Sequence, residues 1–305
     1  MKTPQESYKK LNDFLKIDIY LKREDLHHYG SHKGRSIPLM IKKYFKEEKI
    51  KKFIISSSGN AALAAIFAVQ NHNSNNEEKI QLSIFVGKNI NTEKLKRLNV
   101  LIENDKNIIL KQVNNPKQEA FKTEKQNFQN EKTKFLRQST DENALIGYQE
   151  LAEELINIPN LKAIFIPTSS GTTAEALGNS FEEMKKHEKI KEIPEIHIVQ
   201  TTSCFPIAQE IFKQKITKEK SLADAIVDKI AHRKNKVLEK IKNSQGSAWI
   251  INNEEIKKAQ ELIAENCDLA ISNNSALSFA GLLKALENNW KFNSKDAVVC
   301  LITGL

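Results

Sequence analysis

Residues 20–38, YLKREDLHHYGSHKGRSIP, are the most informative stretch of this sequence. Their first three residues are predicted to form a short strand, which leads into a polar turn that contains glycine. The turn places Ser31-His32-Lys33-Gly34 at the start of a predicted helix, SIPLMIKKYFKEE. Backbone N–H groups at a helix N-terminus bind anions such as phosphate. A lysine amine whose pKa is lowered forms a Schiff base with an aldehyde. The turn therefore suits a cofactor that carries both an aldehyde and a phosphate.

Length and composition indicate a globular protein of one large or two moderate domains. The chain has 305 residues, of which 40% are hydrophobic, enough for a sizeable core. No segment approaches the roughly 18–20 consecutive apolar residues of a membrane helix, and the N-terminus lacks the apolar core of a signal peptide. Cys204, Cys267 and Cys300 are widely spaced, without a CxxC pair. We therefore expect reduced thiols, no metal site, no membrane contact and a cytoplasmic location.

The positive charge of the chain does not indicate nucleic-acid binding. The formal net charge is +9, but the lysines alternate with glutamates along helical stretches such as FEEMKKHEKIKEI. This alternation is typical of solvated helix faces. The sequence has no arginine-rich block and no interleaving of aromatic and basic residues, which nucleic-acid binding would favour.

Short β-rich runs alternate with longer helical segments along the whole chain. Apolar runs of five to seven residues bounded by Gly, Ser, Pro or Asn are typical of buried parallel strands. The predicted strands are 20–22, 51–56, 80–86, 107–113, 134–138, 162–168, 195–201 and 297–303. The predicted helices between them include 36–48, 59–72, 92–101, 117–131, 144–156 and 173–187. This order predicts an α/β fold with mostly parallel sheets and helices on both faces.

Two further loops lie where a predicted strand leads into a predicted helix. One is Ser56-Ser57-Ser58-Gly59-Asn60, and the other is Thr168-Ser169-Ser170-Gly171-Thr172-Thr173. Small residues let the backbone approach a ligand closely, and a helix N-terminus favours a negative charge. For the first loop the alternative is an ordinary helix cap, because Ser and Asn are preferred at caps anyway.

The stretch 20–38 resembles the cofactor-lysine segment of the fold-type II pyridoxal-phosphate enzymes. This family includes threonine synthase, threonine and serine dehydratases, cysteine synthase and the tryptophan synthase beta subunit. Its K-x-E-x-L-x-x-x-G-S-x-K pattern identifies Lys33 as the lysine that binds pyridoxal 5'-phosphate; the alternative is an ordinary surface lysine. Blocks 143–156 and 221–286 are also similar to the family, in the same order, and 221–286 follows the threonine synthase and dehydratase branch.

The resemblance assigns a role to each loop. The loop before Asn60 holds the substrate carboxylate, and Asn60 bonds to the cofactor ring oxygen. The second loop binds the cofactor phosphate, with His32 near it, and the hydroxyl of Thr303 meets the pyridine nitrogen. The implied substrate residues are Ser57, Ser58, Gly59 and Asn60. The implied cofactor residues are His32, Lys33, Asn60, Ser169, Ser170, Gly171, Thr172, Thr173 and Thr303.

Some positions depart from the family pattern. The phosphate loop is usually richer in glycine, and here only Gly171 remains. Relatives place an acid before the S-x-A segment of 272–277, whereas this chain reads Ala-Ile-Ser-Asn-Asn-Ser over 270–275. Relatives usually continue beyond the position of Leu305. These departures leave open a cofactor-binding protein without amino-acid turnover.

The resemblance also implies a domain arrangement and a reaction. Residues 1–39 and 141–305 form a large cofactor-binding domain, residues 40–140 form a smaller inserted domain, and the cofactor lies in the cleft between these two three-layer, open-sheet domains. The implied reaction is elimination or replacement at the side chain of a hydroxy- or phospho-hydroxy amino acid, as in threonine synthase. Serine/threonine ammonia-lyase and cysteine synthase-like β-replacement stay open as alternatives. The family also implies a possible homodimer.

Overall fold

The computed structural model describes residues 2–127, 132–213 and 216–304. The chain divides into two compact units. The first unit contains residues 1–27 and 148–305, and the second contains residues 28–147. Each is an α/β unit around its own sheet, which confirms the predicted fold class.

The first unit has a six-stranded sheet in the order β1-β2-β10-β7-β8-β9. All neighbouring strands pair in parallel except β1, which runs antiparallel to β2. The strands are β1 (Gln5–Ser7), β2 (Asp18–Arg23), β7 (Leu161–Pro167), β8 (Glu195–Thr201), β9 (Ala248–Ile251) and β10 (Ala297–Ile302). The helices are α1 (Lys9–Leu15), η1 (Glu24–Leu26), α7 (Gln149–Leu155), α8 (Thr172–Lys186), α9 (Ala208–Ile211), α10 (Lys234–Ser244), α11 (Asn253–Cys267) and α12 (Asn273–Glu287).

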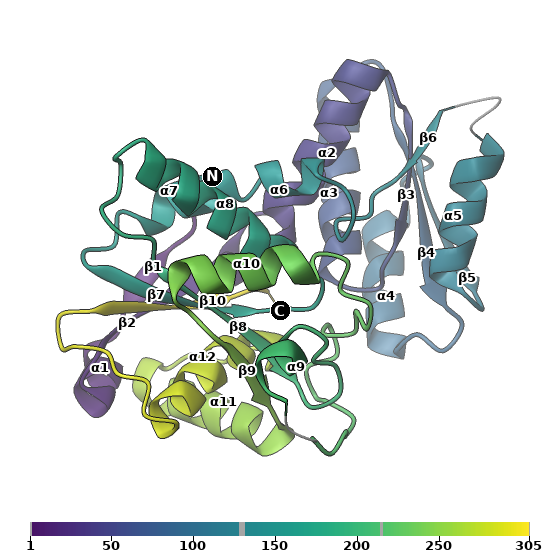
Figure 1. Ribbon diagram of the computed structural model, residues 1–305. Helices are drawn as coiled ribbons and strands as arrows, with labels where there is room; N and C mark the ends of the chain where they lie inside the picture. Colours follow the sequence, from purple (N-terminus) through teal and green to yellow (C-terminus); the bar gives the residue numbers. More distant parts are fainter. Residues whose placement is uncertain (1, 128–131, 214–215, 305) are drawn as a thin grey trace. The chain divides into compact units, whose positions relative to one another are not determined.

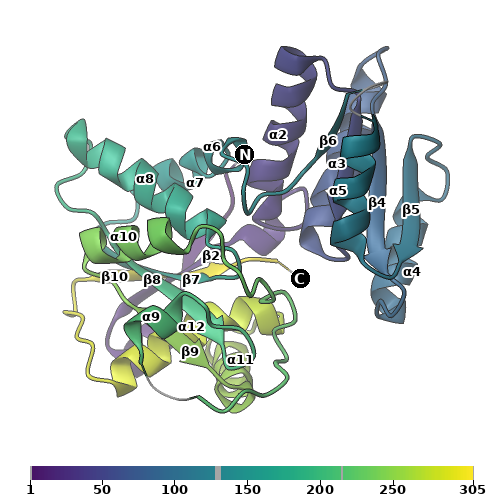
Figure 2. The same ribbon diagram turned by 45° about the vertical axis from the view of Figure 1, so that its right-hand side comes forward.

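Helices cover both faces of this sheet. Helices α8 and α10 lie on one face, and α11 and α12 lie on the other (Figures 1 and 2). Every residue of β10 is buried, as is every residue of β8. A strand that is buried on both faces loses the alternation of polar and apolar residues, which is why AVVCLI reads as one continuous apolar run.

The second unit has a four-stranded parallel sheet in the order β5-β4-β3-β6. Successive residues of β3 point to opposite faces: Phe53 and Ile55 pack into the core formed with α2 and α3, and Ile54 packs towards α5. Figure 1 shows α5 on the side of this sheet opposite to α2 and α3. The strands are β3 (Lys52–Ser56), β4 (Gln81–Gly87), β5 (Ile108–Val113) and β6 (Thr133–Phe135). The helices are α2 (Lys33–Glu48), α3 (Asn60–Asn75), α4 (Thr92–Ile102), α5 (Pro116–Asn127) and α6 (Asn143–Ile146).

Several elements differ from the sequence-based prediction. The antiparallel strand β1 and the short strand β9 were not predicted. The helix predicted over 144–156 is two helices, α6 and α7, separated by Gly147 and Tyr148. A Cβ atom at Gly147 would lie 1.9 Å from the carbonyl oxygen of Arg35, so the chain passes closer to α2 than a side chain permits. Of the helix predicted over 117–131, residues 128–131 lie outside the described residues.

A buried ion pair holds β2 in the first unit. The ammonium of Lys22 lies 2.5 Å from Glu154 Oε2, and their side chains are 0% and 4% exposed. Lys22 Nζ also donates to the carbonyl oxygen of Thr3 at 2.8 Å. Because removal of one partner from such a pair leaves a buried charge uncompensated, at a cost of about 3–5 kcal/mol, β2 is firmly tied to α7 and to the N-terminal segment.

A second buried network surrounds His197 of β8. The indole N–H of Trp249 donates to His197 Nδ1 at 3.2 Å, so Nε2 carries the proton and donates to Glu195 at 3.1 Å. The Phe165 ring stacks on the imidazole with a centroid distance of 4.4 Å. Burial lowers the pKa of His197 below the usual 6.5, although its hydrogen bond to Glu195 acts in the opposite direction. The folded protein therefore favours the neutral imidazole.

No helix among the described residues is both long and apolar enough to cross a membrane.

The His197 network predicts a loss of stability in mild acid. The unfolded chain takes up a proton near the ordinary histidine pKa while the folded chain resists it, so stability falls as the pH drops through and below that value. We expect the free energy of unfolding in urea to fall between pH 7.5 and pH 5, with this group contributing at most about 1.4 kcal/mol per pH unit. His197→Gln should flatten this dependence. His187→Gln, which removes an exposed imidazole from the C-cap of α8, is the control. An unchanged slope in His197→Gln would contradict the prediction.

Candidate active site

The turn before Lys33 is fixed by local hydrogen bonds. Gly30 has a φ of +77°, a left-handed conformation that favours glycine. The carbonyl oxygen of Ser31 accepts the N–H of Gly34 at 2.9 Å, and the Ser31 hydroxyl oxygen accepts the N–H of Lys33 at 3.3 Å. Lys33 is therefore the first residue of α2, and its backbone position is well defined.

The environment of Lys33 shifts its amine towards the neutral form. Its side chain is partly buried, and burial lowers its pKa from the ordinary 10.5 to about 8. Desolvation penalises the ammonium form of a lysine, and a neutral amine is the form that attacks a carbonyl carbon. These properties distinguish Lys33 from an ordinary surface lysine.

The loop after β3 begins α3 at a glycine. Gly59 is the N-cap residue of α3, so the N-cap position supplies no side-chain cap to the first turn. The Ser57 hydroxyl oxygen instead accepts the N–H of Gly59 at 3.2 Å. The serines and Asn60 of this loop therefore do not occupy the N-cap position itself. The first N–H groups of a helix have no acceptor within the helix, so this turn offers donors to an anion.

The loop after β7 has a similar construction. Gly171 is the N-cap residue of α8, with a φ of +92° and no side-chain cap among the described residues. A Cβ atom here would lie 2.6 Å from Val237 Cγ2. The backbone therefore turns into α8 in a conformation and a space that suit glycine, and it directs the first N–H groups of α8 towards the loop.

The serine and threonine hydroxyls of this loop have local partners. The Ser169 hydroxyl oxygen accepts the N–H groups of Val227 and Asp228 at 3.1 and 3.2 Å. The hydroxyls of Ser170 and Thr172 lie 2.9 Å apart. Ser169 therefore ties the loop to the 227–228 segment. This tie could not be predicted from the sequence, because the partners are 58 and 59 residues apart.

Thr303 directly follows β10, and its side chain is 5% exposed. Strands β10 and β7 are parallel neighbours. Because the carboxyl ends of parallel strands lie at one edge of the sheet, Thr303 and the loop of residues 168–173 leave the first unit's sheet at the same edge. Ser272 and Ser275, which the sequence marked only as a departure from the family, contact Gly304.

The predicted site residues therefore fall into two groups. Residues 32–33 and 57–60 belong to the second unit, and residues 169–173 and Thr303 belong to the first. Among the described residues, no group of three or more His, Cys, Asp or Glu side chains is placed to hold a metal ion.

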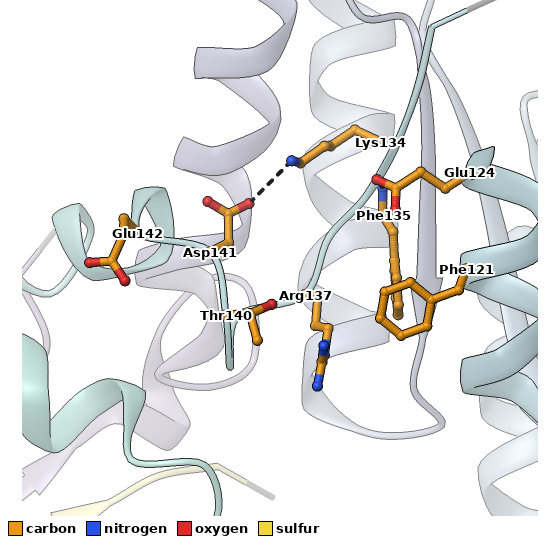
Figure 3. Close-up of a pocket in the computed structure, with 8 residues that line it drawn as sticks. All are labelled: Phe121, Glu124, Lys134, Phe135, Arg137, Thr140, Asp141 and Glu142. Carbon is orange, nitrogen blue, oxygen red and sulfur yellow. Dashed lines mark hydrogen bonds and ion pairs between the residues drawn. The ribbon is translucent and has the colours of Figure 1, made fainter. Parts of the chain in front are cut away.

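The second unit also contains a pocket of about 230 Å³ that lies apart from these predicted residues. Figure 3 shows its lining, including the ion pair of Lys134 with Asp141 at 3.9 Å. Asp141 also accepts the Tyr44 hydroxyl at 2.6 Å, and Glu124 accepts the N–H of Phe135 at 2.9 Å. The carboxylates of Asp141 and Glu124 therefore already have hydrogen-bond partners within the protein. The lining residues are Phe121, Glu124, Lys134, Phe135, Arg137, Thr140, Asp141 and Glu142.

Comparison with known proteins identifies the family. The family model described as pyridoxal-phosphate dependent enzyme matches residues 1–304, so the chain belongs to this family, which uses pyridoxal 5'-phosphate. A threonine synthase of Methanocaldococcus jannaschii is 28% identical over 184 residues. That match covers 57% of this chain and 45% of the relative, so it spans less than half of the relative's length.

Solved structures share the fold. The processed form of threonine deaminase isoform 2 from Solanum lycopersicum has a TM-score of 0.80 and 18% identity, and the match covers 100% of this chain and 84% of that one. An L-serine ammonia-lyase from Rhizomucor miehei has a TM-score of 0.77 and 19% identity, covering 100% and 93%. A serine racemase from Dictyostelium discoideum has a TM-score of 0.77 and 19% identity, covering 100% and 92%. At these identities the likeness shows the fold alone.

The lowered pKa of Lys33 predicts selective reactivity near neutral pH. Acetic anhydride acylates neutral amines, so acylation of Lys33 in cofactor-free protein should rise with a half-point at about pH 8 rather than at the ordinary 10.5. Peptide mass spectrometry after short exposures between pH 6 and 11 measures this. The peptide with the exposed Lys42, on the same helix, is the internal reference. A half-point for Lys33 near 10.5 would show that burial does not act on this amine.

The conformation of Gly171 predicts a cost for any side chain there. Gly171→Ala should lower the free energy of unfolding by about 1–3 kcal/mol, because of the left-handed φ and the contact with Val237. Urea unfolding measures this. Gly59→Ala is the matched control: that glycine also begins a helix, but it has no left-handed φ, and its Cβ would meet no atom within 4 Å. Equal losses in both variants would contradict the interpretation.

Proposed function

We propose that this chain is a pyridoxal-phosphate-dependent lyase that acts on a hydroxy- or phospho-hydroxy amino acid, with Lys33 as the cofactor-binding lysine. The observation that carries the proposal is the position of Lys33: it is the first residue of a helix, in a turn fixed by Ser31, and burial brings its pKa to about 8. An amine with these properties is suited both to bonding with an aldehyde and to accepting a proton at neutral pH.

The residues present fit the cofactor. The loop at Gly171 offers the first N–H groups of α8 to the phosphate, in a conformation that a side chain at this position would disturb. We propose that Asn60 binds the ring oxygen, that Thr303 meets the ring nitrogen and that His32 lies by the phosphate. When bound, the cofactor supplies an aldehyde for the amine and a ring that withdraws electrons from the substrate Cα.

The remaining steps belong to the chain's own residues. The N–H groups at the start of α3, with Ser57, Ser58 and Gly59, bind and orient the substrate carboxylate, because the N-cap residue is a glycine without a side chain to compete with it. Lys33 Nζ takes the proton from the substrate Cα as general base. Loss or exchange of the group on the side chain follows.

We propose a threonine synthase-like reaction as the leading candidate for the activity of this chain. Its support is the partial match to a protein named threonine synthase at 28% identity, together with the Thr303-Gly304 pair after β10, which resembles that branch. The buried thiols of Cys204, Cys267 and Cys300 remain unpaired as free cysteines, which supports a reducing compartment such as the cytoplasm. By the family resemblance, we also propose a homodimer.

The proposal predicts a Schiff-base absorption band that depends on Lys33. Purified protein supplied with pyridoxal 5'-phosphate should absorb near the boundary of the visible and ultraviolet, and Lys33→Ala should remove this band. Lys42→Ala, which removes an exposed lysine of the same helix, should leave it unchanged. Absence of the band in the wild-type protein would overturn the cofactor assignment.

A substrate panel then separates the reactions. Serine, threonine, O-acetylserine and O-phosphohomoserine are added in turn, and release of ammonia, acetate or phosphate is measured. Phosphate release from O-phosphohomoserine is the expected result. Ammonia release from serine or threonine would instead indicate an ammonia-lyase, and acetate release with a thiol acceptor would indicate β-replacement. An intact band with no turnover of any compound would indicate a cofactor-binding protein without amino-acid turnover.

A further inference from the structure

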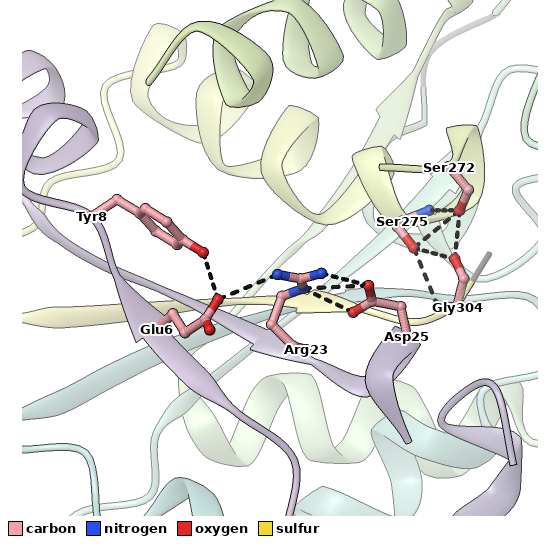
Figure 4. A network of polar contacts seen from close by, with 7 residues as sticks. All are labelled: Glu6, Tyr8, Arg23, Asp25, Ser272, Ser275 and Gly304. Carbon is pink, nitrogen blue, oxygen red and sulfur yellow. Dashed lines mark hydrogen bonds and ion pairs between the residues drawn. The ribbon is translucent and has the colours of Figure 1, made fainter. Parts of the chain in front are cut away.

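Two serines at the start of α12 hold the peptide that follows Thr303. The hydroxyls of Ser272 and Ser275 both donate to the carbonyl oxygen of Gly304, at 2.6 and 2.8 Å. The N–H of Gly304 in turn donates to the Ser275 hydroxyl oxygen at 3.3 Å. Figure 4 shows these contacts. A carbonyl oxygen has two lone pairs, so both polar groups of Gly304 are engaged by these two side chains.

The serines stand on a rigid part of the first unit. Ser275 is fully buried, and Ser272 is the N-cap of α12, accepting the N–H of Ser275 at 3.3 Å. Helix α12 packs on β7 and β10. Because buried hydrogen-bonded groups on a packed helix have little freedom to move, Ser275 presents a fixed partner to Gly304.

The strand side of Thr303 is fixed as well. Ile302, the last residue of β10, pairs with Arg23 of β2. The Arg23 guanidinium is held by Asp25 through contacts of 3.0 and 2.8 Å, and by Glu6 at 3.3 Å (Figure 4). The chain is therefore fixed immediately before Thr303 by the sheet and immediately after it by the two serines.

This double anchoring restricts the Thr303 side chain. The N–H of Gly304 belongs to the planar peptide unit that includes Thr303 Cα, so a fixed N–H fixes that plane. Threonine is branched at Cβ and has few allowed values of χ1. With its backbone held on both sides, the direction of the Thr303 hydroxyl is set by its surroundings.

We infer that Ser275, with Ser272, is a positioning residue that directs the Thr303 hydroxyl towards the ring nitrogen of the cofactor. The inference rests on the proposed function, which gives Thr303 this contact. Ser275 touches neither substrate nor cofactor and acts through the Gly304 peptide. Its loss weakens cofactor binding only where Thr303 keeps its hydroxyl.

A double-mutant cycle between Ser275 and Thr303 tests the inference. Cofactor-free wild type, Ser275→Ala, Thr303→Val and the double variant are titrated with pyridoxal 5'-phosphate, and the dissociation constant is taken from the absorbance of the bound cofactor. Ser275→Ala should weaken binding by about tenfold in the wild-type background and by less than about twofold in the Thr303→Val background. Independent sites would instead give the same factor in both backgrounds.

Matched variants separate positioning from general destabilisation. Ser278 is also fully buried on α12, and its hydroxyl donates to the carbonyl oxygen of Ser275 rather than to Gly304. Ser278→Ala should leave the cofactor dissociation constant within about twofold. If Ser275→Ala does not fold, Ser272→Asp serves in its place, because aspartate keeps a helix cap and lacks the hydroxyl donor. Ser272→Asp should also raise the dissociation constant for the cofactor.

The outcomes distinguish this inference from the proposed function. No cofactor binding by the wild-type protein would overturn the proposed function. If Thr303→Val binds the cofactor as tightly as the wild-type protein does, Thr303 does not contact the ring nitrogen. The inference that Ser275 positions Thr303 for this contact would then be wrong as well. Equal effects of Ser275→Ala in both backgrounds would overturn the inference alone and leave the proposed function standing.

Discussion

Parallel strand pairing is the constraint on which the candidate site depends. The carboxyl ends of neighbouring parallel strands lie at the same edge of a sheet. The loops that follow β7 and β10 therefore leave the sheet of the first unit side by side. The same rule acts in the second unit, where the loop that begins at Ser57 follows β3. Residues that are far apart in sequence, such as Gly171 and Thr303, thus follow strands that end at the same edge of the sheet. The ion pair of Lys22 with Glu154 secures the register of β2 in this arrangement.

The loops at Gly59 and Gly171 share a second physical feature, because each leads into a helix whose N-cap residue is a glycine. Asn252 shows how this chain caps a helix elsewhere: its side chain accepts an N–H of α11, and Glu255 completes a capping box. Helices α3 and α8 begin instead at Gly59 and Gly171, without a side-chain cap among the described residues. A side-chain oxygen in that place would occupy the donors that an anion needs. At both positions the N-cap residue has no side chain that could occupy these donors.

The sequence predicted the α/β class and the loops because both depend on local patterns. Buried runs such as KAIFIP mark strands, and Gly59 and Gly171 mark the turns into helices. Strand β9 was not predicted because its sequence, AWII, is short and because the residues that bury it are distant in sequence. The contact of Ser275 with Gly304 could not be predicted from the sequence either, because hydrogen bonds between residues 29 positions apart leave no pattern in the chain. The pKa of Lys33 also depends on burial, which only the folded chain defines.

The serine-rich loop of residues 168–173 is held by hydrogen bonds that its sequence alone did not suggest. In a glycine-rich loop the backbone approaches an anion freely but has no side chains to fix it. Here Ser169 accepts two backbone N–H groups of the 227–228 segment, and Ser170 contacts Thr172. These hydrogen bonds reduce the freedom of the loop while Gly171 keeps the one left-handed position that the turn into α8 requires. A loop ordered before binding loses less entropy when it binds a ligand, so hydroxyl side chains at these positions are compatible with the proposed anion site.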